Sequence, residues 1–263
     1  MKSAGGLIIG LAALTGAMAA ADGCEAGAWP QKKGKGQAIF KYEAMSAERG
    51  FDPSGGLADL PAEWNDQSLG VFAEYGLTDR LTLQLKGDWQ SGEDAYVDYE
   101  GRGPLEVGLT WAAWRDDRTS ISLYAGYADG GEGRNAGYAA PGVGRADWEV
   151  RASVGRSFGP GKGRWAPSAT FVELQTARRF RSGLSDEVRV DATMGARYGE
   201  NWMLLGQAYA GQTDHGGAGW LSLEASVVRS FGDWSVQAGW RKAVAGREVP
   251  ETGGPVVALW RRF

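Results

Sequence analysis

The chain has 263 residues, with 28 Lys and Arg against 32 Asp and Glu, and a formal net charge of -4. This balance provides no basic surface of the kind that binds nucleic acid, so we expect no nucleic-acid partner. After the N-terminal segment, no apolar run approaches the ~20 residues that a transmembrane helix needs, which excludes a helical membrane protein. The 42 glycines and 12 tryptophans against only 9 prolines favour a structure with many turns and a large aromatic content.

The first 21 residues have the pattern of a secretory signal peptide. Lys2 gives a short basic region, residues 7–14 form an apolar core, and Ala17-Met18-Ala19 supplies small residues at a cleavage site. The alternative is a buried core helix, which the four glycines at positions 5, 6, 10 and 16 disfavour. We therefore expect a signal peptide over 1–21 with cleavage near 19–21, a periplasmic segment over 22–36 and one domain over 37–263.

Cys24 is the sole cysteine, so the chain has no internal disulfide. It lies just after the apolar core, where lipoproteins carry their lipidated cysteine. The preceding Ala21-Asp22-Gly23 lacks the aliphatic residue expected three positions earlier. Lipidation of Cys24 is therefore left open, and a free thiol is the favoured alternative.

From residue 37 onward, apolar and polar residues alternate with period two, which predicts β-strands. The segment from Leu81 to Trp89 is the clearest, because its odd positions are apolar or glycine and its even positions are polar. Clear alternation of this kind occurs at 69–75, 81–89, 105–113, 121–127, 147–154, 187–198, 221–227 and 234–240. Four less regular segments at 37–46, 165–178, 202–211 and 255–263 bring the total to twelve.

The connections between these strands alternate in length. Short turns are expected at 77–80, 115–118, 159–163, 199–201 and 232–233, and longer polar loops at 47–67, 90–103, 128–145, 181–186, 212–217 and 243–254. Short turns at one end and long loops at the other are typical of bacterial outer-membrane barrels, in which the short turns are periplasmic. The sequence thus predicts an all-β, antiparallel, up-and-down transmembrane β-barrel of about 12 strands.

Aromatic residues flank the short turns. We expect these rings to lie at a membrane interface, where an apolar ring with a polar N–H or O–H is favoured. The predicted interface aromatics are Tyr75, Trp114, Phe158, Trp165, Tyr198, Trp202, Phe231 and Trp234. A soluble sandwich or barrel is the alternative, but it would carry its aromatic residues in the core rather than beside the turns.

The final strand ends at Phe263. A terminal aromatic residue after alternating positions such as Val257 and Leu259 resembles the assembly signal of Gram-negative outer-membrane proteins, although Arg261 departs from that pattern. The segments FAEYGLTDRLTLQLKGDW (72–89) and PLEVGLTWAAWRDDRTSISLYAGY (104–127) resemble the channel-type outer-membrane family of phenol-degradation meta pathways. The resemblance implies a twelve-stranded channel for small solutes, among them apolar or aromatic ones, with no catalytic residues.

Polar side chains opposite the lipid-facing set are expected to line the barrel interior. They carry both charges and are Lys86, Asp88, Glu106, Asp147, Glu149, Arg151, Glu187, Arg189, Asp191, Arg197, Glu224 and Arg241. Charged walls of this kind select solutes in a channel. Interlocking ion pairs could equally close a narrow barrel, so the pattern leaves channel and plugged barrel as alternatives.

Catalytic and metal sites are not expected. The only histidine, His215, lies in a predicted loop with no serine at a spacing that would pair with it, which argues against an acyl hydrolase. Neither Asp129-Gly130-Gly131-Glu132 nor Asp214-His215 has calcium-loop or zinc-ligand spacing, and Gly159 to Gly163 lacks the ending of a phosphate loop. We therefore predict a non-enzymatic protein without a cofactor or metal.

The predicted partners follow from the membrane location. They are outer-membrane lipids, lipopolysaccharide, the barrel assembly machinery and small solutes, and the protein is expected to be a monomer. Arg178, Arg179 and Arg181 form one local basic cluster, which could pair with lipopolysaccharide phosphates or serve as a charged rim. The leading functional prediction is a porin-like channel, the second is a non-conducting barrel that binds a partner, and the remote third is an outer-membrane hydrolase.

Overall fold

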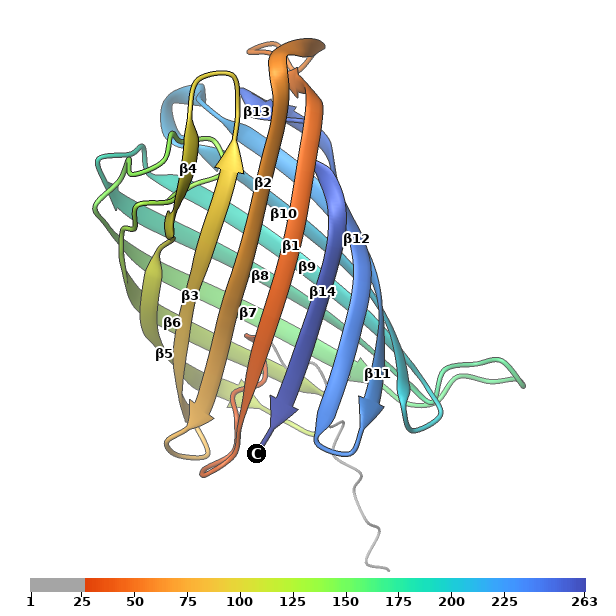
Figure 1. Cartoon of the computed structure of the whole chain (residues 1–263). Helices are drawn as coiled ribbons and strands as arrows, with labels where there is room; N and C mark the ends of the chain where they lie inside the picture. Colours follow the sequence, from red (N-terminus) through yellow and green to blue (C-terminus); the bar gives the residue numbers. More distant parts are fainter. Residues whose placement is uncertain (1–26) are drawn as a thin grey trace, which may run out of the picture.

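The computed structural model describes residues 27–263, which form a closed antiparallel β-barrel (Figure 1). Within this part of the chain, twelve long strands close the barrel and two short strands, β4 (Asp98–Arg102) and β13 (Val249–Pro250), pair outside the main path with β3 and β1. The predicted fold class is confirmed. The predicted signal peptide lies outside the described residues.

The twelve barrel strands follow one another around the wall in chain order. They are β1 (Gly36–Phe51), β2 (Leu57–Gly76), β3 (Leu81–Glu93), β5 (Leu105–Arg115), β6 (Thr119–Asp129), β7 (Ala146–Phe158), β8 (Ala169–Ser182), β9 (Glu187–Tyr198), β10 (Trp202–Thr213), β11 (Gly219–Phe231), β12 (Trp234–Arg247) and β14 (Gly253–Arg262). The barrel closes where β1 pairs with β14, in a register that joins Gln37 to Arg262 and Tyr42 to Val257. Closure leaves no unpaired strand edge in the wall. A membrane-spanning sheet needs this, because the bilayer core has no water to bond free backbone N–H and C=O groups.

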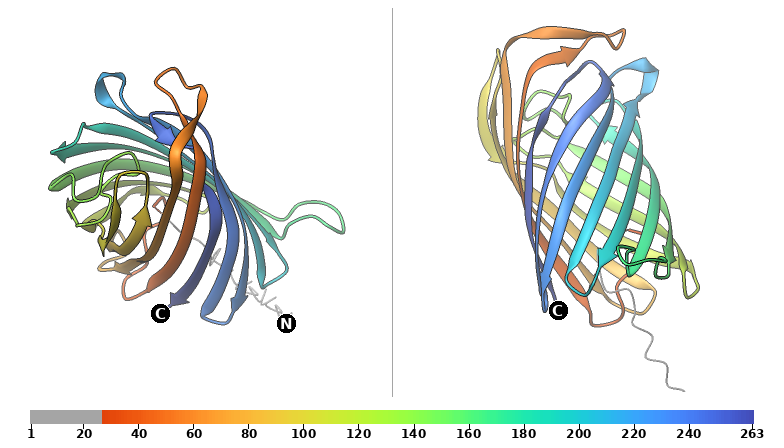
Figure 2. Two further views of the ribbon diagram at one scale, coloured as in Figure 1. Left: turned by 45° about the horizontal axis from the view of Figure 1, so that its top comes forward. Right: turned by 90° about the vertical axis from the view of Figure 1, so that its right-hand side faces the viewer.

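The two ends of the barrel differ. At one end, here called the turn end, lie the short connections and the C terminus; at the other, the loop end, lie the β1–β2 hairpin, β4 and β13 (Figures 1 and 2). Segments 47–67, 90–103 and 243–254, expected as loops, are largely paired strands, because β1 continues to Phe51, β2 begins at Leu57 and β12 continues to Arg247. There the apolar alternation ends while the backbone ladder continues, since both faces of the hairpins meet water.

One connection at the turn end is longer than expected. Residues 159–168 join β7 to β8, so Trp165 lies in this connection and the strand begins only at Ala169. Pro160 and Pro167 have no N–H to donate to a ladder, which explains why the strands stop before this segment. Figure 1 shows the connection projecting from the barrel at its turn end.

No helix in the described residues is long and apolar enough to cross a membrane. The one helical element between residues 27 and 263 is the short 3-10 turn η1 (Asp214–Gly216) in the β10–β11 loop, where His215 has a positive φ of 58°.

Candidate functional site

The outer surface of the barrel wall is apolar. In β5, for example, Leu105, Val107, Leu109 and Trp111 are exposed, whereas the alternating side chains between them are buried. The same exposed apolar face continues around the other strands. A closed belt of this kind matches the hydrocarbon of a bilayer.

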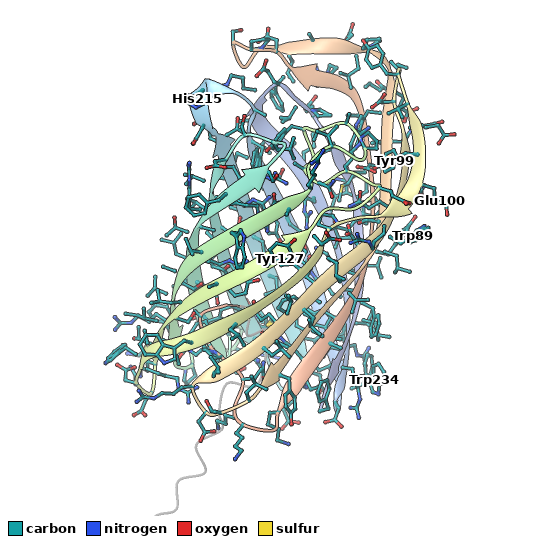
Figure 3. The ribbon with its side chains drawn as sticks, turned by 90° about the vertical axis from the view of Figure 1, so that its left-hand side faces the viewer. Trp89, Tyr99, Glu100, Tyr127, His215 and Trp234 are labelled. Atoms are coloured by element: carbon teal, nitrogen blue, oxygen red, sulfur yellow. The ribbon has the colours of Figure 1, made fainter. Side chains whose placement is uncertain are left out.

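Aromatic rings gather at the turn end of this belt. All eight predicted interface aromatics are exposed, and seven lie at strand ends beside the turns, while Trp165 lies in the 159–168 connection. Phe263 stacks against Tyr75 with ring centroids 6.5 Å apart. Figure 3 shows Trp234 at this end of the barrel and His215 at the loop end. Arg261, which is irregular for a terminal strand, lies over the Trp234 ring and pairs with Asp233 at 2.8 Å.

The structure places all twelve predicted lumen residues on the strand face opposite the lipid-facing side chains. Their exposure differs: Glu106, Asp147, Glu149, Glu187 and Glu224 are buried by neighbouring side chains, and the other seven retain contact with solvent. Lys86 is exposed although it points inward between the buried Gln84 and the half-buried Asp88. The interior is thus ion-paired on some walls and open to water at others.

The largest ionic cluster lies on β5, β7, β8 and β9. Arg179 binds Glu149 at 2.6 Å and Glu106 at 2.7 Å, and Arg181 binds Asp147 at 2.9 Å and Glu187 at 3.0 Å. The side chains of Arg181 and Glu187 are both fully buried. Charged groups removed from water in this way need ion-pair and hydrogen-bond partners within the protein. The contacts of Arg179 and Arg181 supply these partners.

Sequence reasoning missed Arg179 and Arg181 as lumen residues because it treated them as one rim cluster with Arg178. The strand alternation separates them, since Arg179 and Arg181 point inward while Arg178 points outward and donates to Asp214 at 2.7 Å. The available signal was the phase of β8, in which Glu173, Gln175 and Ala177 share the inward face with these two arginines.

A second ionic cluster lies on the opposite wall, on β1, β11 and β12. Arg241 binds Glu43 at 2.8 Å and Glu224 at 2.7 Å, and Lys41 binds Glu43 at 2.8 Å. The Arg241 guanidinium also lies 4.6 Å from the centroid of the Tyr209 ring. Two charged walls therefore face each other across the lumen.

At the loop end, residues 130–145 fold into the barrel mouth and contact two sides of it, the region of β3 and β4 and the region of β9 and β11; we call these residues the mouth loop. On one side Arg134 binds Asp94 at 2.6 Å and lies 5.1 Å from the Tyr99 ring centroid. On the other side the Tyr138 hydroxyl donates to Glu187 at 2.8 Å, and its ring stacks on Trp220. Burial, together with the charge of Glu187, raises the pKa of Tyr138 to about 12, which keeps this donor protonated.

At the turn end, residues 27–33 lie inside the lumen; we call them the inner segment. The Ala28 amide donates to the inward Glu173 at 3.1 Å, and Gln31 donates to the inward Glu74 at 2.7 Å. Trp29 meets Phe171 edge to face, with ring centroids 6.1 Å apart. Through these contacts the inner segment lies against the inward faces of β2 and β8. It is therefore inside the barrel rather than beside it.

An apolar patch occupies the inner wall near the same end. Met203, Leu205, Val228, Ala258 and Trp260 pack together on the inward faces of β10, β11 and β14. The Trp260 indole N–H is buried and has no hydrogen-bond acceptor among the described residues.

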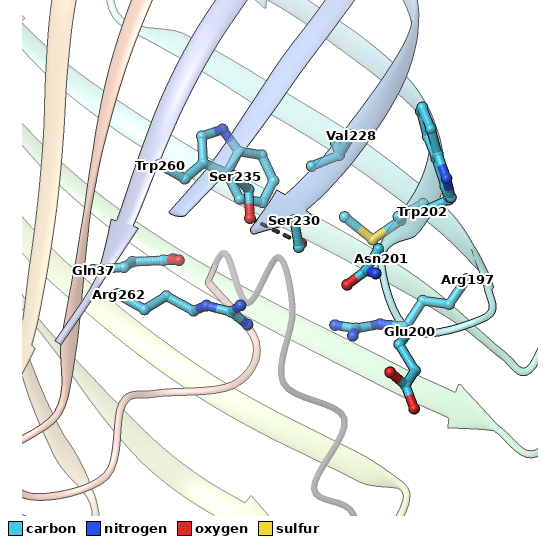
Figure 4. Close-up of a pocket in the computed structure, with 11 residues that line it drawn as sticks. Gln37, Arg197, Glu200, Asn201, Trp202, Val228, Ser230, Ser235, Trp260 and Arg262 are labelled. Carbon is cyan, nitrogen blue, oxygen red and sulfur yellow. Dashed lines mark hydrogen bonds between the residues drawn. The ribbon is translucent and has the colours of Figure 1, made fainter. Parts of the chain in front are cut away.

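Beside this patch lies a small solvent-connected pocket, in which apolar and polar side chains face each other (Figure 4). It is lined by Trp260, Val228, Ser230, Ser235, Arg197 and Arg262, among others. This part of the lumen therefore has an apolar wall on one side and charged side chains at its rim.

No cluster of three or more metal-ligating side chains occurs within residues 27–263. His215 is exposed in the η1 turn at the loop end. Its neighbour Asp214 is held by Arg178, whose hydrogen bond lowers the Asp214 pKa. Gly159 to Gly163 lies in the β7–β8 connection with no helix after it.

Solved structures of other proteins share this architecture. The crystal structure of an outer membrane channel from Pseudomonas putida F1 matches with a TM-score of 0.65 at 13% identity, over 92% of this chain and 100% of that chain. The NanC porin matches with a TM-score of 0.53 at 6% identity (85% and 100% covered), and the KdgM porin with 0.52 at 6% (86% and 99%). The fold is that of outer-membrane channels and porins. The predicted resemblance to a channel-type outer-membrane protein is confirmed at the level of fold.

No protein-family model matches the sequence, and no curated protein matches it. In bacterial outer-membrane barrels the short turns face the periplasm and the longer loops face the outside. What passes through this barrel must be argued from its own lumen.

Proposed function

We propose that this protein is a monomeric, non-enzymatic outer-membrane channel for small solutes. The observation that carries the proposal is Lys86, an inward-facing cation that is exposed to solvent inside a closed wall. A side chain in that position requires water-sized space within the barrel. Charges beside such a space act on passing solutes at short range.

The envelope surroundings form part of the same proposal. The signal peptide over 1–21 would direct export, and the terminal Phe263 would be read by the barrel assembly machinery. The aromatic belt at the turn end would contact phospholipids, and Arg178 near the loop end could meet lipopolysaccharide phosphates. The expected location is the outer membrane.

The apolar inner patch favours solutes with an apolar or aromatic part. Met203, Val228 and Trp260 are buried side chains that line the pocket at the turn end, where they give such a solute an apolar wall away from the ionic clusters. Ligand sites commonly combine apolar walls with a few polar groups in this way. We infer that amphipathic small molecules use this wall.

A non-conducting, partner-binding barrel is the second candidate, and a specific observation favours it. The mouth loop enters the lumen from one end and the inner segment enters it from the other, so both ends are narrowed. If the two segments close the path completely, the loop end alone would carry function by binding an external partner.

Conductance in planar bilayers separates the two candidates. The channel predicts discrete single-channel currents for the purified protein, and Lys86→Glu should shift its ion selectivity toward cations because it reverses an accessible lumen charge. Lys162→Glu is the matched control, since Lys162 is exposed in the 159–168 connection outside the barrel wall. A barrel that stays silent in every salt would favour the scaffold, and unchanged selectivity in Lys86→Glu would remove Lys86 from the path.

A further inference from the structure

Arg229 lies in the lipid-facing surface near the turn end of β11, held between two aromatic rings. Its guanidinium carbon is 4.9 Å from the ring centroid of Trp202 and 4.9 Å from that of Phe231. Trp202 is its cross-strand neighbour on β10, and Phe231 is two residues further along β11 on the same face. The two rings fix the direction of the side chain while its N–H edges stay available.

Arg229 has no acidic partner, unlike three other outward arginines. Arg102 pairs with Asp129 at 2.8 Å, Arg178 binds Asp214, and Arg261 pairs with Asp233 at 2.8 Å. Within residues 27–263, no carboxylate lies within ion-pair distance of Arg229 and no acceptor takes a hydrogen bond from its side chain. The five guanidinium N–H donors therefore have no acceptor in the part of the chain that the structure describes.

The surroundings of Arg229 are apolar. Its neighbours on the outer face are Val227 on the same strand and Leu204 and Val236 on the adjacent strands, all of them exposed. A guanidinium at the edge of hydrocarbon extends toward the membrane interface, where an anion can satisfy its donors. The group found at that depth in a bilayer is the lipid phosphate, which arginine binds through paired donors.

We propose that Arg229, Trp202 and Phe231 form a binding site for the phosphate of an anionic glycerophospholipid in the periplasmic leaflet. The choice of leaflet rests on the proposed outer-membrane location, since the turn end faces the periplasm. The rings hold the cation by cation–π contact and pack against the acyl-chain region, and the guanidinium edges bind the headgroup. Arg156, over the Phe158 ring at 5.9 Å, repeats the arrangement more weakly because it lies in the field of Asp116.

The test measures lipid retention rather than conductance. The purified full chain, Arg229→Gln and Arg102→Gln are reconstituted in phosphatidylcholine nanodiscs with increasing fractions of phosphatidylglycerol. Phosphatidylglycerol retained after detergent extraction is then counted by mass spectrometry. Wild type and Arg102→Gln should retain it equally, and Arg229→Gln should bind it about fivefold more weakly, the factor that corresponds to about 1 kcal/mol per interfacial arginine.

Two further measurements keep the outcome decisive. Arg229→Lys retains the charge but loses paired donors and ring stacking, so its retention should fall between wild type and Arg229→Gln; it also serves if Arg229→Gln does not fold. Lipid A added as competitor should displace phosphatidylglycerol poorly. Equal retention in Arg229→Gln, no preference over phosphatidylcholine in wild type, or full displacement by lipid A overturns the proposal. A barrel that is silent in bilayers yet retains phosphatidylglycerol would reject the channel and leave this site standing.

Discussion

Arg181 and Glu187 form an ion pair of 3.0 Å inside the barrel, with both side chains fully buried. Arg181 also donates to the backbone carbonyl of Asn135 in the mouth loop at 2.7 Å, so the pair joins the wall to the loop. Arg181→Met should lower the free energy of unfolding by about 3 kcal/mol, because it leaves the buried Glu187 with Arg189 alone and Asp147 with the more distant Arg179. Urea unfolding in detergent micelles measures the loss.

The control for that variant is Arg178→Met in the same strand. Arg178 points outward, and its contacts with Asp214 and Asp186 are partly exposed, so its replacement should cost much less stability than the replacement of Arg181. If both variants lose the same free energy of unfolding, the buried pair of Arg181 and Glu187 contributes no more to stability than the outward contacts of Arg178.

Tyr138 fastens the mouth loop to the wall that carries Glu187 and Trp220. Tyr138→Ala removes both the hydrogen bond and the ring stack, so the loop should loosen and single-channel conductance should rise, with more current noise. Tyr96→Ala is a suitable control, because Tyr96 is 86% exposed between β3 and β4. A conductance equal to wild type would place the narrowest point elsewhere.

Gly155 lies under the ring of Trp29. A Cβ at this position would come within 2.3 Å of the Trp29 ring, so Gly155→Val should displace the inner segment and enlarge the pore. Gly159→Val is the control, since a Cβ there meets no atom within 4 Å. Liposome swelling with sugars of increasing size measures the exclusion limit. No change in that limit would mean that the inner segment does not narrow the path.

The barrel wall could be predicted from the sequence because the bilayer imposes its pattern directly. Every outward position between the interfaces must be apolar, so alternation such as that from Leu81 to Trp89 marks both the strand and its facing. Where the strands leave the membrane this requirement disappears, which is why the pairing of Phe51 with Val249 and the early start of β2 at Leu57 were missed.

The two segments inside the lumen could not be predicted in the same way. The contacts of Trp29 with Phe171 and of Arg134 with Asp94 join residues far apart in the chain, and neither segment has a periodic pattern of its own. The same applies to Arg179, whose partners Glu106 and Glu149 come from other strands. Phase could identify such residues as inward-facing, but only the closed barrel brings the partners together.

Asp94 anchors the other side of the mouth loop through Arg134. Burial opposes ionisation of Asp94, but the hydrogen bond and charge of Arg134 outweigh it, so the pKa of this external carboxyl is below its ordinary value of 3.8. Because this pKa is lowered, the ion pair between Asp94 and Arg134 holds the mouth loop with full strength above the ordinary pKa value. This stabilisation is lost as the pH falls through the pKa of Asp94 in the folded protein. The difference in conductance between wild type and Asp94→Asn should therefore stay constant from neutral pH down to about 4 and disappear only below it. Asp94→Asn should give the higher conductance at neutral pH, and a difference that is already lost near pH 6 would contradict this assignment.

Val228 lies in the apolar inner patch, packed with Met203 and Trp260. If this wall takes the apolar part of a solute, benzyl alcohol should interrupt the single-channel current by binding there, and Val228→Asp should weaken the block about tenfold by placing a charge in the patch. Val227→Thr is the matched control, because Val227 is the neighbouring residue on the lipid-facing side. Current recordings at several benzyl alcohol concentrations give the blocking constant for each variant. If benzyl alcohol blocks Val228→Asp as readily as it blocks wild type, the apolar patch serves only to pack the barrel interior. The solute then passes along the charged walls.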